Sequence, residues 1–534
     1  MSHLSYNISQ LDNKNSPWIA VIILLLIVFI ELFAILHLNT GKFLFTLDDA
    51  YIHLALAENL LHGHYGVNIN EYSSPSSSIL WPFLITPLAG LEAAGFLILI
   101  INLMTATGCL FLVWKIMRLP EGAPVYAGVN EKLHALILLI LFILASNLVG
   151  LIFTGMEHSV QLFLSITILF GLIYEIEHKQ VKWWFASAII IAPLVRYECL
   201  ALSLPAVLYL YLTGYRAKAA MVAGAMIVFL TLFSILLVIL GLEPLPNSVL
   251  AKSALVSSDG RIDAIVTNIR QSLSIPKGTL LAAMMLIFIS LSLIKTKTRR
   301  ERLFTATMAA AICLHLMAGQ YGWYGRYEPY IWTTAVLALL YMYKIKMYEF
   351  ADRLGQHKAA VIIALAVFLF NWEYAKILFT IPVASNNIYQ QHYQMSRFVK
   401  EYYRKPVAVN DIGYVSYNNN EYVLDLYGLA SQETLKSRLT NRDPFWMDTI
   451  VNKHNVKLAM FYDRWYRNIP ANWQKVGEMQ LARDNIALGS KSVSFYIVGC
   501  DSFMETYDLV RNFASSLPQG IPFKFNNFPL RNCQ

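Results

Sequence analysis

Long apolar runs constrain this chain more than any other feature. The run from Trp18 to Leu38 has about the number of apolar residues that a bilayer requires, and Glu31 is its only charge. Of the 534 residues, 57% are hydrophobic and only 14% are charged, which does not suit a soluble globular protein. The sequence therefore predicts a polytopic α-helical membrane protein. The first run is expected to stay as an anchor, because it is long and lacks a small-residue cleavage site.

Basic residues gather in four loops, which the positive-inside rule assigns to the cytoplasm. The most basic loop, residues 295–302, reads KTKTRRER, and weaker ones cover residues 175–182, 215–218 and 344–358. Counting from these loops gives about eleven spans. It also places the loops that contain residues 48, 154–158, 243–276 and 320–328 on the external side. The net charge of +8 belongs largely to the loops, so no nucleic-acid partner is expected.

Two stretches do not fit simple spans. Residues 79–117 are too long for one crossing and short for two, which predicts a partial or re-entrant piece inside the protein or along a cavity. Residues 183–200 and 201–211 are also short for spans, so Arg196 and Glu198 are expected at their external turn.

The tail from residue 384 to 534 has a different composition, richer in Trp, Tyr, Asn and charge. Helical patterns at 389–403 and 444–453 alternate with strand-like runs at 406–409, 422–426, 458–462 and 492–498. This pattern predicts a soluble α/β domain after a membrane domain that covers residues 1–383. By the span count the tail lies outside the cytoplasm, in the periplasm of a bacterium whose inner membrane holds the chain.

Asp48 and Asp49 form a carboxylate doublet a few residues after the first apolar run. The following residues, 50–62, have helical spacing and predict an amphipathic helix at the membrane interface. Asp48 alone could be a helix N-cap, but one cap needs one carboxylate. The doublet instead suits a general base, with a second carboxylate, Asp49, to orient it or bind a divalent cation. His53 shares their face, either as a site residue or as an ordinary interfacial histidine.

Charged residues in the external loops are further candidates. Lys252 follows Asn247 in the stretch PNSVLAK, and Arg326 follows Tyr324 in YGRYE. Both cations oppose the sidedness rule, so phosphate binding is one interpretation, and snorkelling or an Arg326–Glu328 salt bridge is the other.

The acidic and basic residues of two other loops have similar alternatives. Arg196 and Glu198 could form a structural ion pair at a turn, and Glu157 could simply end a span.

Other sequence features exclude or leave open certain chemistry. The chain has no GxxxxGK[ST] phosphate loop, so direct ATP hydrolysis has no support. Its five cysteines show no metal-ligand spacing. Only Cys500 and Cys533 lie outside apolar runs, so only they could form a disulfide.

A series of short motifs resembles the GT-C superfamily of membrane glycosyltransferases. The motifs are LDDAYIHLALAENLLHGHYGVNINEYSSPSSSILWPFLI from residue 47, then TGMEHS, VRYE, LPNSVLAK, GRYEP and VNDIGYVSY…VLDLYGLAS, in that order. The terminal arabinofuranosyltransferase branch of mycobacterial cell-wall enzymes, with its relatives in other bacteria, is the nearest resemblance. The order of the motifs, from about residue 40 to 430, carries the specificity.

The resemblance implies a GT-C fold that transfers a sugar, such as arabinofuranose, from a polyprenyl-phosphate donor to a periplasmic acceptor. Asp48 and Asp49 take the place of the acidic motif, with one as catalytic base. Glu157 matches the next external acid, and Lys252 and Arg326 match positions suited to the lipid phosphate. Tyr197 stands where a proline is usual, and residues 327–329 replace a more apolar run, which puts the substrate in doubt more than the chemistry.

Several identities stay open at this stage. The acceptor could be a glycan, a lipid or a protein, and Mg²⁺, Mn²⁺ or Ca²⁺ could assist the departing phosphate. A flippase or exporter of lipid-linked glycans is the rival function, and an O-antigen-type polymerase a weaker one. The flippase reading predicts charges buried mid-span, whereas the ionisable residues cluster at one membrane face.

Overall fold

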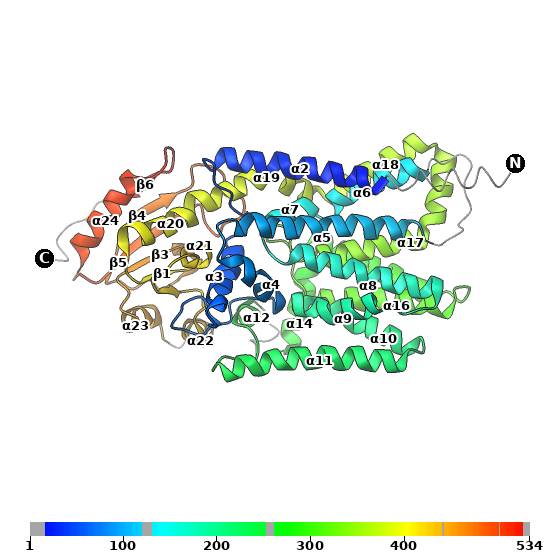
Figure 1. Ribbon diagram of the computed structural model, residues 1–534, viewed down its shortest axis with the longest axis horizontal. Helices are drawn as coiled ribbons and strands as arrows, with labels where there is room; N and C mark the ends of the chain where they lie inside the picture. The colour runs from blue at the N-terminus through cyan, green and yellow to red at the C-terminus, as the bar shows by residue number, and fades with distance from the viewer. Residues whose placement is uncertain (1–15, 120–130, 253–260, 441–442, 501, 527–534) are drawn as a thin grey trace.

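The computed structural model describes residues 16–119, 131–252, 261–440, 443–500 and 502–526. It consists of a bundle of helices that lie along the long axis and a smaller part built on a β-sheet at one end (Figure 1). The sheet part belongs to the C-terminal half of the chain, and it covers the end of the bundle where α3 and α12 lie. We call these two parts the bundle and the tail domain.

The bundle contains the helices up to residue 388. They are α2 (Ser16–Leu38), α3 (Asp49–Leu61), α4 (Leu80–Ala89), α5 (Ala94–Met117), α6 (Glu131–Ala145), α7 (Leu148–Phe153), α8 (His158–His178), α9 (Trp183–Val195), η1 (Tyr197–Cys199), α10 (Leu200–Leu212), α11 (Arg216–Ile239), α12 (Asn247–Lys252), α14 (Arg261–Ser274), α15 (Pro276–Leu293), α16 (Arg299–Ala318), α17 (Pro329–Leu354), α18 (Gln356–Phe370) and α19 (Trp372–Ile388).

Five helices of the described residues are long and apolar enough to cross a membrane: α2, α5, α8, α11 and α15. A sixth span results if residues 357–370 and 372–403, which meet at a bend of 70°, are counted together. Four more apolar helices are shorter, among them α4, α9 and α10, and each of these three contains a proline. The chain thus has the character of a multi-pass membrane protein, and the count of about eleven spans stays a prediction.

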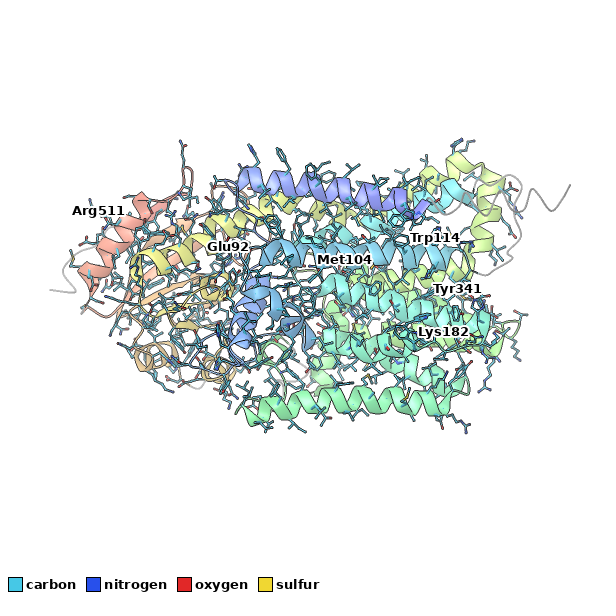
Figure 2. The ribbon with its side chains drawn as sticks, in the orientation of Figure 1. Glu92, Met104, Trp114, Lys182, Tyr341 and Arg511 are labelled. Carbon is cyan, nitrogen blue, oxygen red and sulfur yellow. The ribbon has the colours of Figure 1, made fainter. Side chains whose placement is uncertain are left out.

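The ends of the bundle differ from its middle, as expected for a membrane protein. Trp114 and Lys182 lie toward the end of the bundle that is farthest from the tail domain, whereas Met104 lies nearer the middle (Figure 2). Met104 is 68% exposed, although the helix that carries it is apolar. Exposed apolar side chains in the middle, with tryptophan and lysine toward an end, are the pattern that a bilayer imposes.

The long apolar stretch of residues 79–117 divides as predicted into a short piece and a span. Helix α4 has 10 residues and covers only about 15 Å, which is half of a hydrocarbon core. Helix α5 has 24 residues and is a full span. One part of α4 packs against α3 and α5, whereas its side chains Phe83 and Leu84 are exposed.

Helix α3 differs from the prediction of an amphipathic interfacial helix. All residues from Ala50 to Ala57 are buried. Ile52 and Ala55 belong to the apolar core of the tail domain. Residues on the other side of α3, such as Leu54, pack into a second core with Trp81 of α4. Small and apolar side chains all around the helix allow both parts to pack on it, so α3 is an interior helix that joins the bundle to the tail domain.

The tail domain is a six-stranded mixed sheet with helices. The strands follow the order β2-β1-β3-β5-β4-β6; β1 is parallel to β2 and β3, and the other pairs are antiparallel. They are β1 (Val407–Val409), β2 (Val423–Asp425), β3 (Leu458–Phe461), β4 (Trp473–Gln480), β5 (Ser492–Val498) and β6 (Phe523–Phe525). Among its helical segments are η2 (Tyr389–Tyr393), α20 (Gln394–Arg397), η3 (Phe398–Tyr403), α21 (Gly413–Ser416), α22 (Gln432–Thr440), α23 (Trp446–Lys453), η4 (Asp463–Trp465) and α24 (Phe503–Ser515).

The four predicted strands are confirmed as β1, β2, β3 and β5, and the predicted helices at 389–403 and 444–453 are found there. The sequence does not predict β4 or β6. The β4 sequence WQKVGEMQ lacks a clean alternation of apolar and polar residues, and its pairing with β5 shifts register between Lys475 and Gly477. The chain enters the tail domain through an uninterrupted helical run, α19 to η3, so residue 384 lies within a helix rather than in a linker. The domain boundary there stays a prediction.

Cys500 is disulfide-bonded, whereas Cys533 lies outside the described residues. Their pairing therefore stays a prediction.

Replacing Gly413 with alanine should weaken the contact between α3 and the tail domain. A Cβ atom there would lie 2.1 Å from the backbone oxygen of Asp48 and 2.7 Å from its carboxylate carbon, which forces one of them to move. Such overpacking costs about 1–3 kcal/mol, so we expect a lower thermal unfolding midpoint in detergent. Gly224→Ala is the control, since nothing lies within 4 Å of its added Cβ. Equal midpoints for the two variants would contradict a tight contact at Gly413.

Candidate functional site

A polar cavity of about 640 Å³ lies where the bundle meets the tail domain. Its charged lining residues are Asp49 and Arg326 from the bundle and Asp411 from the tail domain. The lining as a whole consists of Asp49, Ile52, Ala251, Asn268, Gln271, Ser272, Ile275, Gly319, Gln320, Tyr321, Trp323, Arg326, Tyr327, Asn410, Asp411, Ile412, Tyr427, Leu429 and Trp465. Charge, amides and aromatic rings converge here from both parts.

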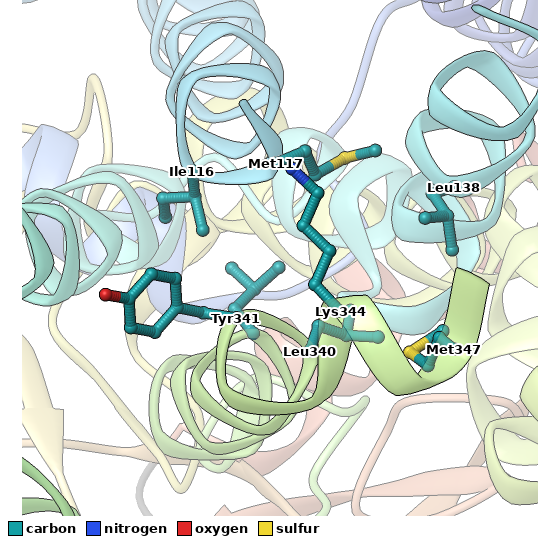
Figure 3. A pocket seen from close by; sticks show the side chains of 8 residues that line it. Ile116, Met117, Leu138, Leu340, Tyr341, Lys344 and Met347 are labelled. Carbon is teal, nitrogen blue, oxygen red and sulfur yellow. The ribbon is translucent and has the colours of Figure 1, made fainter. Parts of the chain in front are cut away.

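Two other hollows within the bundle are apolar. One, of about 710 Å³, is lined mostly by aliphatic side chains of α5, α6, α15, α17 and α18. A small one, of about 40 Å³, lies between Ile116, Leu138 and Tyr341, and the side chain of Lys344 extends across it (Figure 3). Neither lining offers the converging polar groups that catalysis needs, so the polar cavity is the candidate site.

The pair Asp49–Arg326 forms one wall of this cavity. The Nη2 group of Arg326 donates to a carboxylate oxygen of Asp49 and, at 3.0 Å, to the hydroxyl of Tyr327. Arg326 is buried, and the Asp49 side chain is 23% exposed. The alternative of an Arg326–Glu328 salt bridge is wrong, because Glu328 instead accepts hydrogen bonds from the Gly322 amide and from a tyrosine hydroxyl of α19.

An unusual turn aims Arg326 at Asp49. Gly322, Trp323, Tyr324 and Gly325 have φ angles of 75°, 43°, 65° and 59°, four left-handed residues in succession. The side-chain amide of Asn147 holds this turn by donating to the carbonyl oxygens of Tyr324 (3.3 Å) and Gly325 (2.8 Å). Backbone strain of this kind persists only where the surroundings fix it, and here it places a buried guanidinium beside a cavity.

Asp48 faces away from Asp49 and toward the tail domain. Its two carboxylate oxygens accept the backbone N–H groups of Gly413 (2.7 Å) and Tyr414 (2.8 Å). Its side chain makes no capping bond to α3, so the N-cap alternative is wrong. Burial raises the pKa of Asp48 to about 6, against the opposing effects of His392 and the two amides. The doublet therefore divides into one carboxylate in the cavity and one that holds the two parts together.

The predicted residues His53, Glu157, Arg196 and Glu198 meet in a buried ionic network beside the cavity. Arg196 donates from Nη1 to Glu157 at 2.8 Å and from Nε to Glu198 at 3.1 Å. His53 Nε2 lies 3.4 Å from the second oxygen of Glu157. None of these four residues lines the cavity. The sequence indicated each of these residues separately but not their contacts with one another. The alternative of an Arg196–Glu198 ion pair is confirmed, and a role in substrate binding stays a prediction.

The ring of Tyr327 connects this network to the cavity. The guanidinium carbons of Arg196 and Arg326 lie 5.7 Å and 5.0 Å from its centre, within the range of cation–π attraction. Because Tyr327 itself lines the cavity, the network supports the wall that carries Arg326.

The other predicted residues lie nearby with different roles. Asn247 is fully buried in α12, and its backbone N–H donates to Ser74 Oγ at 3.1 Å. The side chain of Lys252 lies outside the described residues, although its neighbour Ala251 lines the cavity. Tyr324 packs with the apolar cores and is not part of the lining.

Asp411 and His392 of the tail domain were not predicted as site residues. Asp411 lines the cavity, and its Oδ2 lies 3.3 Å from His392 Nε2. Burial lowers the pKa of His392, but Asp48 and Asp411 outweigh it and raise that pKa above its ordinary value. The motif VNDIGYVSY contains Asp411, yet a single aspartate more than 360 positions from the doublet gave no spatial signal.

The residues present do not fit the predicted divalent cation. Within the described ranges, no group of three or more His, Cys, Asp or Glu side chains is arranged to hold a metal ion. Asp49 forms an ion pair with Arg326, which already places a cation beside its carboxylate. We therefore assign no step to a metal.

Comparisons with known proteins add little about activity. Residues 386–496 match a family described as a domain of unknown function, DUF8728, which is well under half of the chain. No curated protein matches the sequence. The chain is similar to the oligosaccharyltransferase of Archaeoglobus fulgidus, whose crystal structure is a complex with zinc and sulfate. That likeness has 11% identity and a TM-score of 0.45, and covers 86% of this chain and 72% of the other. It is too weak to support an argument about activity.

Breaking the buried network should destabilise the fold strongly. Arg196→Met leaves the fully buried Glu157 without its main counter-charge, which costs about 3–5 kcal/mol for a pair of this kind. Thermal or denaturant unfolding of the purified protein measures the loss. The exposed pair Lys376–Glu373 provides the control, since Lys376→Met should cost less than about 1 kcal/mol. Similar losses for both variants would contradict a special role of the network.

Stability should fall as the pH rises above neutrality. His392 has a folded-state pKa above its ordinary 6.5, so its protonated form stabilises the fold below pH 6.5, and this contribution is lost as the pH rises through the folded value. Asp48 titrates in a lower window: its contribution is lost as the pH rises from its ordinary 3.8 through its folded pKa of about 6, so the fall above neutrality belongs to His392. Besides Asp48, the groups around His392 are Asp411, Asp49 and Tyr462.

Unfolding midpoints of the protein between about pH 6 and 8.5 provide the test. His392→Gln should flatten the fall above pH 6.5, whereas His62→Gln, an exposed position at the end of α3, should leave it unchanged. A fall that is identical in the protein and in His392→Gln would assign the titration to other groups.

Proposed function

We propose that this protein is a membrane glycosyltransferase of the GT-C type. It transfers a sugar from a polyprenyl-phosphate donor to an acceptor hydroxyl. The resemblance of its motifs to those of arabinofuranosyltransferases favours a pentofuranose such as arabinofuranose as that sugar. The observation that carries the proposal is the polar cavity at one end of the bundle, where Asp49 and Arg326 lie beside a wall of aromatic and amide side chains. A lipid-linked donor reaches such a cavity from the bilayer. The sugar–phosphate bond of the donor drives the transfer, so the protein needs no nucleotide-binding loop.

The two charged residues of the bundle wall suit the two halves of the reaction. The Asp49 carboxylate takes the proton of the acceptor hydroxyl while that oxygen attacks the anomeric carbon of the donor sugar. The bond from the anomeric carbon to the phosphate oxygen breaks, and polyprenyl phosphate leaves with the electron pair. The Arg326 guanidinium stabilises the charge on the departing phosphate.

Of the doublet, Asp49 is the better base. Asp49 lines the cavity, whereas both carboxylate oxygens of Asp48 are occupied by backbone amides of the tail domain. Asp49 also forms an ion pair with Arg326, the group that we assign to the donor phosphate. Donor binding would draw Arg326 toward the phosphate and free the carboxylate for the acceptor.

The cellular arrangement follows from the sidedness of the basic loops. We assign the end of the bundle that carries the cavity, and the tail domain from residue 384, to the periplasmic side of a bacterial inner membrane. The end of the bundle far from the tail domain carries the basic residues 295–302, which fits a cytoplasmic face. The partners are then a lipid-linked sugar, the acceptor and membrane lipids.

Asp49→Asn should abolish sugar transfer, and it should also lower the unfolding midpoint because the buried Arg326 loses its counter-charge, so transfer is compared at a temperature where the variant is folded. Asparagine keeps the shape but cannot accept the proton, so we expect a loss of at least about a hundredfold in kcat. Asp48→Asn should lower the unfolding midpoint and reduce transfer less. The measurement is transfer from a polyprenyl-phosphate pentofuranose in proteoliposomes, with the exposed Asp508→Asn as control. Full activity of Asp49→Asn would rule out its role as base, and lipid transport without sugar transfer would favour the flippase.

A further inference from the structure

The second wall of the cavity belongs to the tail domain, and its polar and aromatic residues are Asn410, Asp411, Tyr427 and Trp465, beside the apolar Ile412 and Leu429. We propose that this wall binds the acceptor, that the acceptor is a carbohydrate, and that Asp411 and Asn410 hold its hydroxyl groups. The proposal rests on the proposed function for the reaction itself, but its binding step is independent of the donor. Of the three acceptor classes that the sequence leaves open, glycan, lipid and protein, we thus propose the glycan.

Two half-buried aromatic rings form the flat part of this wall. The ring centres of Tyr427 and Trp465 lie 5.5 Å apart at an angle of 54°. The C–H groups on one face of a sugar ring carry a slight positive charge, and they pack on the negative face of an aromatic ring. Two adjacent rings at an angle therefore offer a stacking surface for one or two sugar units.

Both rings are held by close neighbours. The guanidinium of Arg438 lies 3.9 Å from the ring centre of Tyr427, and the ring of Tyr462 lies 5.2 Å from Trp465, edge to face. A Cβ atom at Gly489 would lie 2.4 Å from Trp465, so the backbone there approaches the indole as closely as only glycine allows. Rings that are fixed before a ligand binds lose little freedom on binding.

The polar pair beside the rings matches the bonding of a sugar hydroxyl. Asn410 is 3% exposed; its Oδ1 accepts the backbone N–H of Tyr462 at 3.1 Å, but its Nδ2 has no hydrogen-bond partner. A buried donor without a partner is costly and indicates a missing acceptor. The neighbouring Asp411 carboxylate is an acceptor, held by His392 on one side and 27% exposed. One donor and one acceptor at adjacent positions suit a hydroxyl pair, since each hydroxyl both donates and accepts.

Further contacts fix the loops that carry these groups. The Asp425 carboxylate accepts the backbone N–H groups of Tyr427 (2.7 Å) and Ala430 (2.8 Å), which sets the turn beneath the aromatic rings. Asp48 of the bundle holds the amides of Gly413 and Tyr414, directly after the Asn410–Asp411 pair. The wall is therefore positioned by carboxylates on both sides.

Charge separates the two walls by ligand type. Among the described lining residues, the one cation is Arg326, on the bundle wall, and the tail-domain wall carries only the negative Asp411. An anionic acceptor would be repelled from Asp411, whereas an uncharged polyhydroxylated ligand would not. The donor phosphate thus belongs on the bundle side and the acceptor sugar on the tail-domain side.

The test measures sugar binding by the full chain in nanodiscs without any donor. The probes are a panel of uncharged methyl pentosides and hexosides and their disaccharides, followed by saturation-transfer NMR and by tryptophan fluorescence. We expect at least one sugar to bind, and Trp465→Ala and Asn410→Ala to weaken it about tenfold or more each. Trp446→Ala, a half-buried tryptophan of α23 outside the cavity, is the matched control.

A second measurement separates positioning from folding. In the transfer assay, at a temperature where each variant is folded, Asn410→Ala and Asp411→Asn should raise KM for the acceptor about tenfold or more, with the KM for the donor little changed. The proposal would be overturned if the wild-type protein bound none of the sugars. It would also be overturned if only a serine- or tyrosine-containing peptide, and no sugar, competed with the acceptor. If Asp49→Asn loses transfer but the wall variants keep their acceptor KM, this wall does not bind the acceptor and the glycosyltransferase proposal stands. If sugars bind the wall but Asp49→Asn is fully active, the wall stands and the proposed catalytic base is wrong.

Discussion

The carboxylate of Asp48 is the contact on which the arrangement of this protein depends. It lies at the head of α3 in the bundle, and it accepts two consecutive amides of the tail domain, Gly413 and Tyr414. A carboxylate shared by two backbone N–H groups is fixed in direction as well as distance. Since Asp49 is the next residue and Asp411 lies two positions before Gly413, this one contact sets the two acidic groups of the cavity relative to each other.

The packing of α3 reinforces that contact. One side of α3 completes the core of the tail domain through Ile52 and Ala55, and the other packs with Trp81 of the bundle. A helix that contributes to two cores cannot rotate or slide without opening both of them. The cavity between the two parts can therefore be polar and hollow without making the junction weak, because the apolar packing that holds the junction lies beside the cavity.

The sequence predicted local features well and pairings poorly. Alternating apolar residues revealed β1, β2, β3 and β5, and unusual external charges identified Arg196 and Arg326. It could not reveal that Arg326 pairs with Asp49 rather than with its near neighbour Glu328, because four left-handed residues in succession, Gly322 to Gly325, set the direction of the chain before Arg326. The helical spacing of α3 predicts that one face of the helix is exposed to water, but the tail domain covers that face. His392 and Asp411 gained meaning only from a contact across the fold.

The division of labour within the doublet explains why two acidic residues stand side by side. A carboxylate whose two oxygens bind amides of the tail domain is held in one place and does not line the cavity, whereas a base must face the acceptor there. Adjacent residues at a helix start point in different directions, so Asp48 and Asp49 serve opposite walls from a single position in the chain. Docking of the tail domain and placement of the proposed base are thus coupled by one peptide bond. Any movement of the tail domain that pulled on Asp48 would also change the geometry of Asp49 and Arg326.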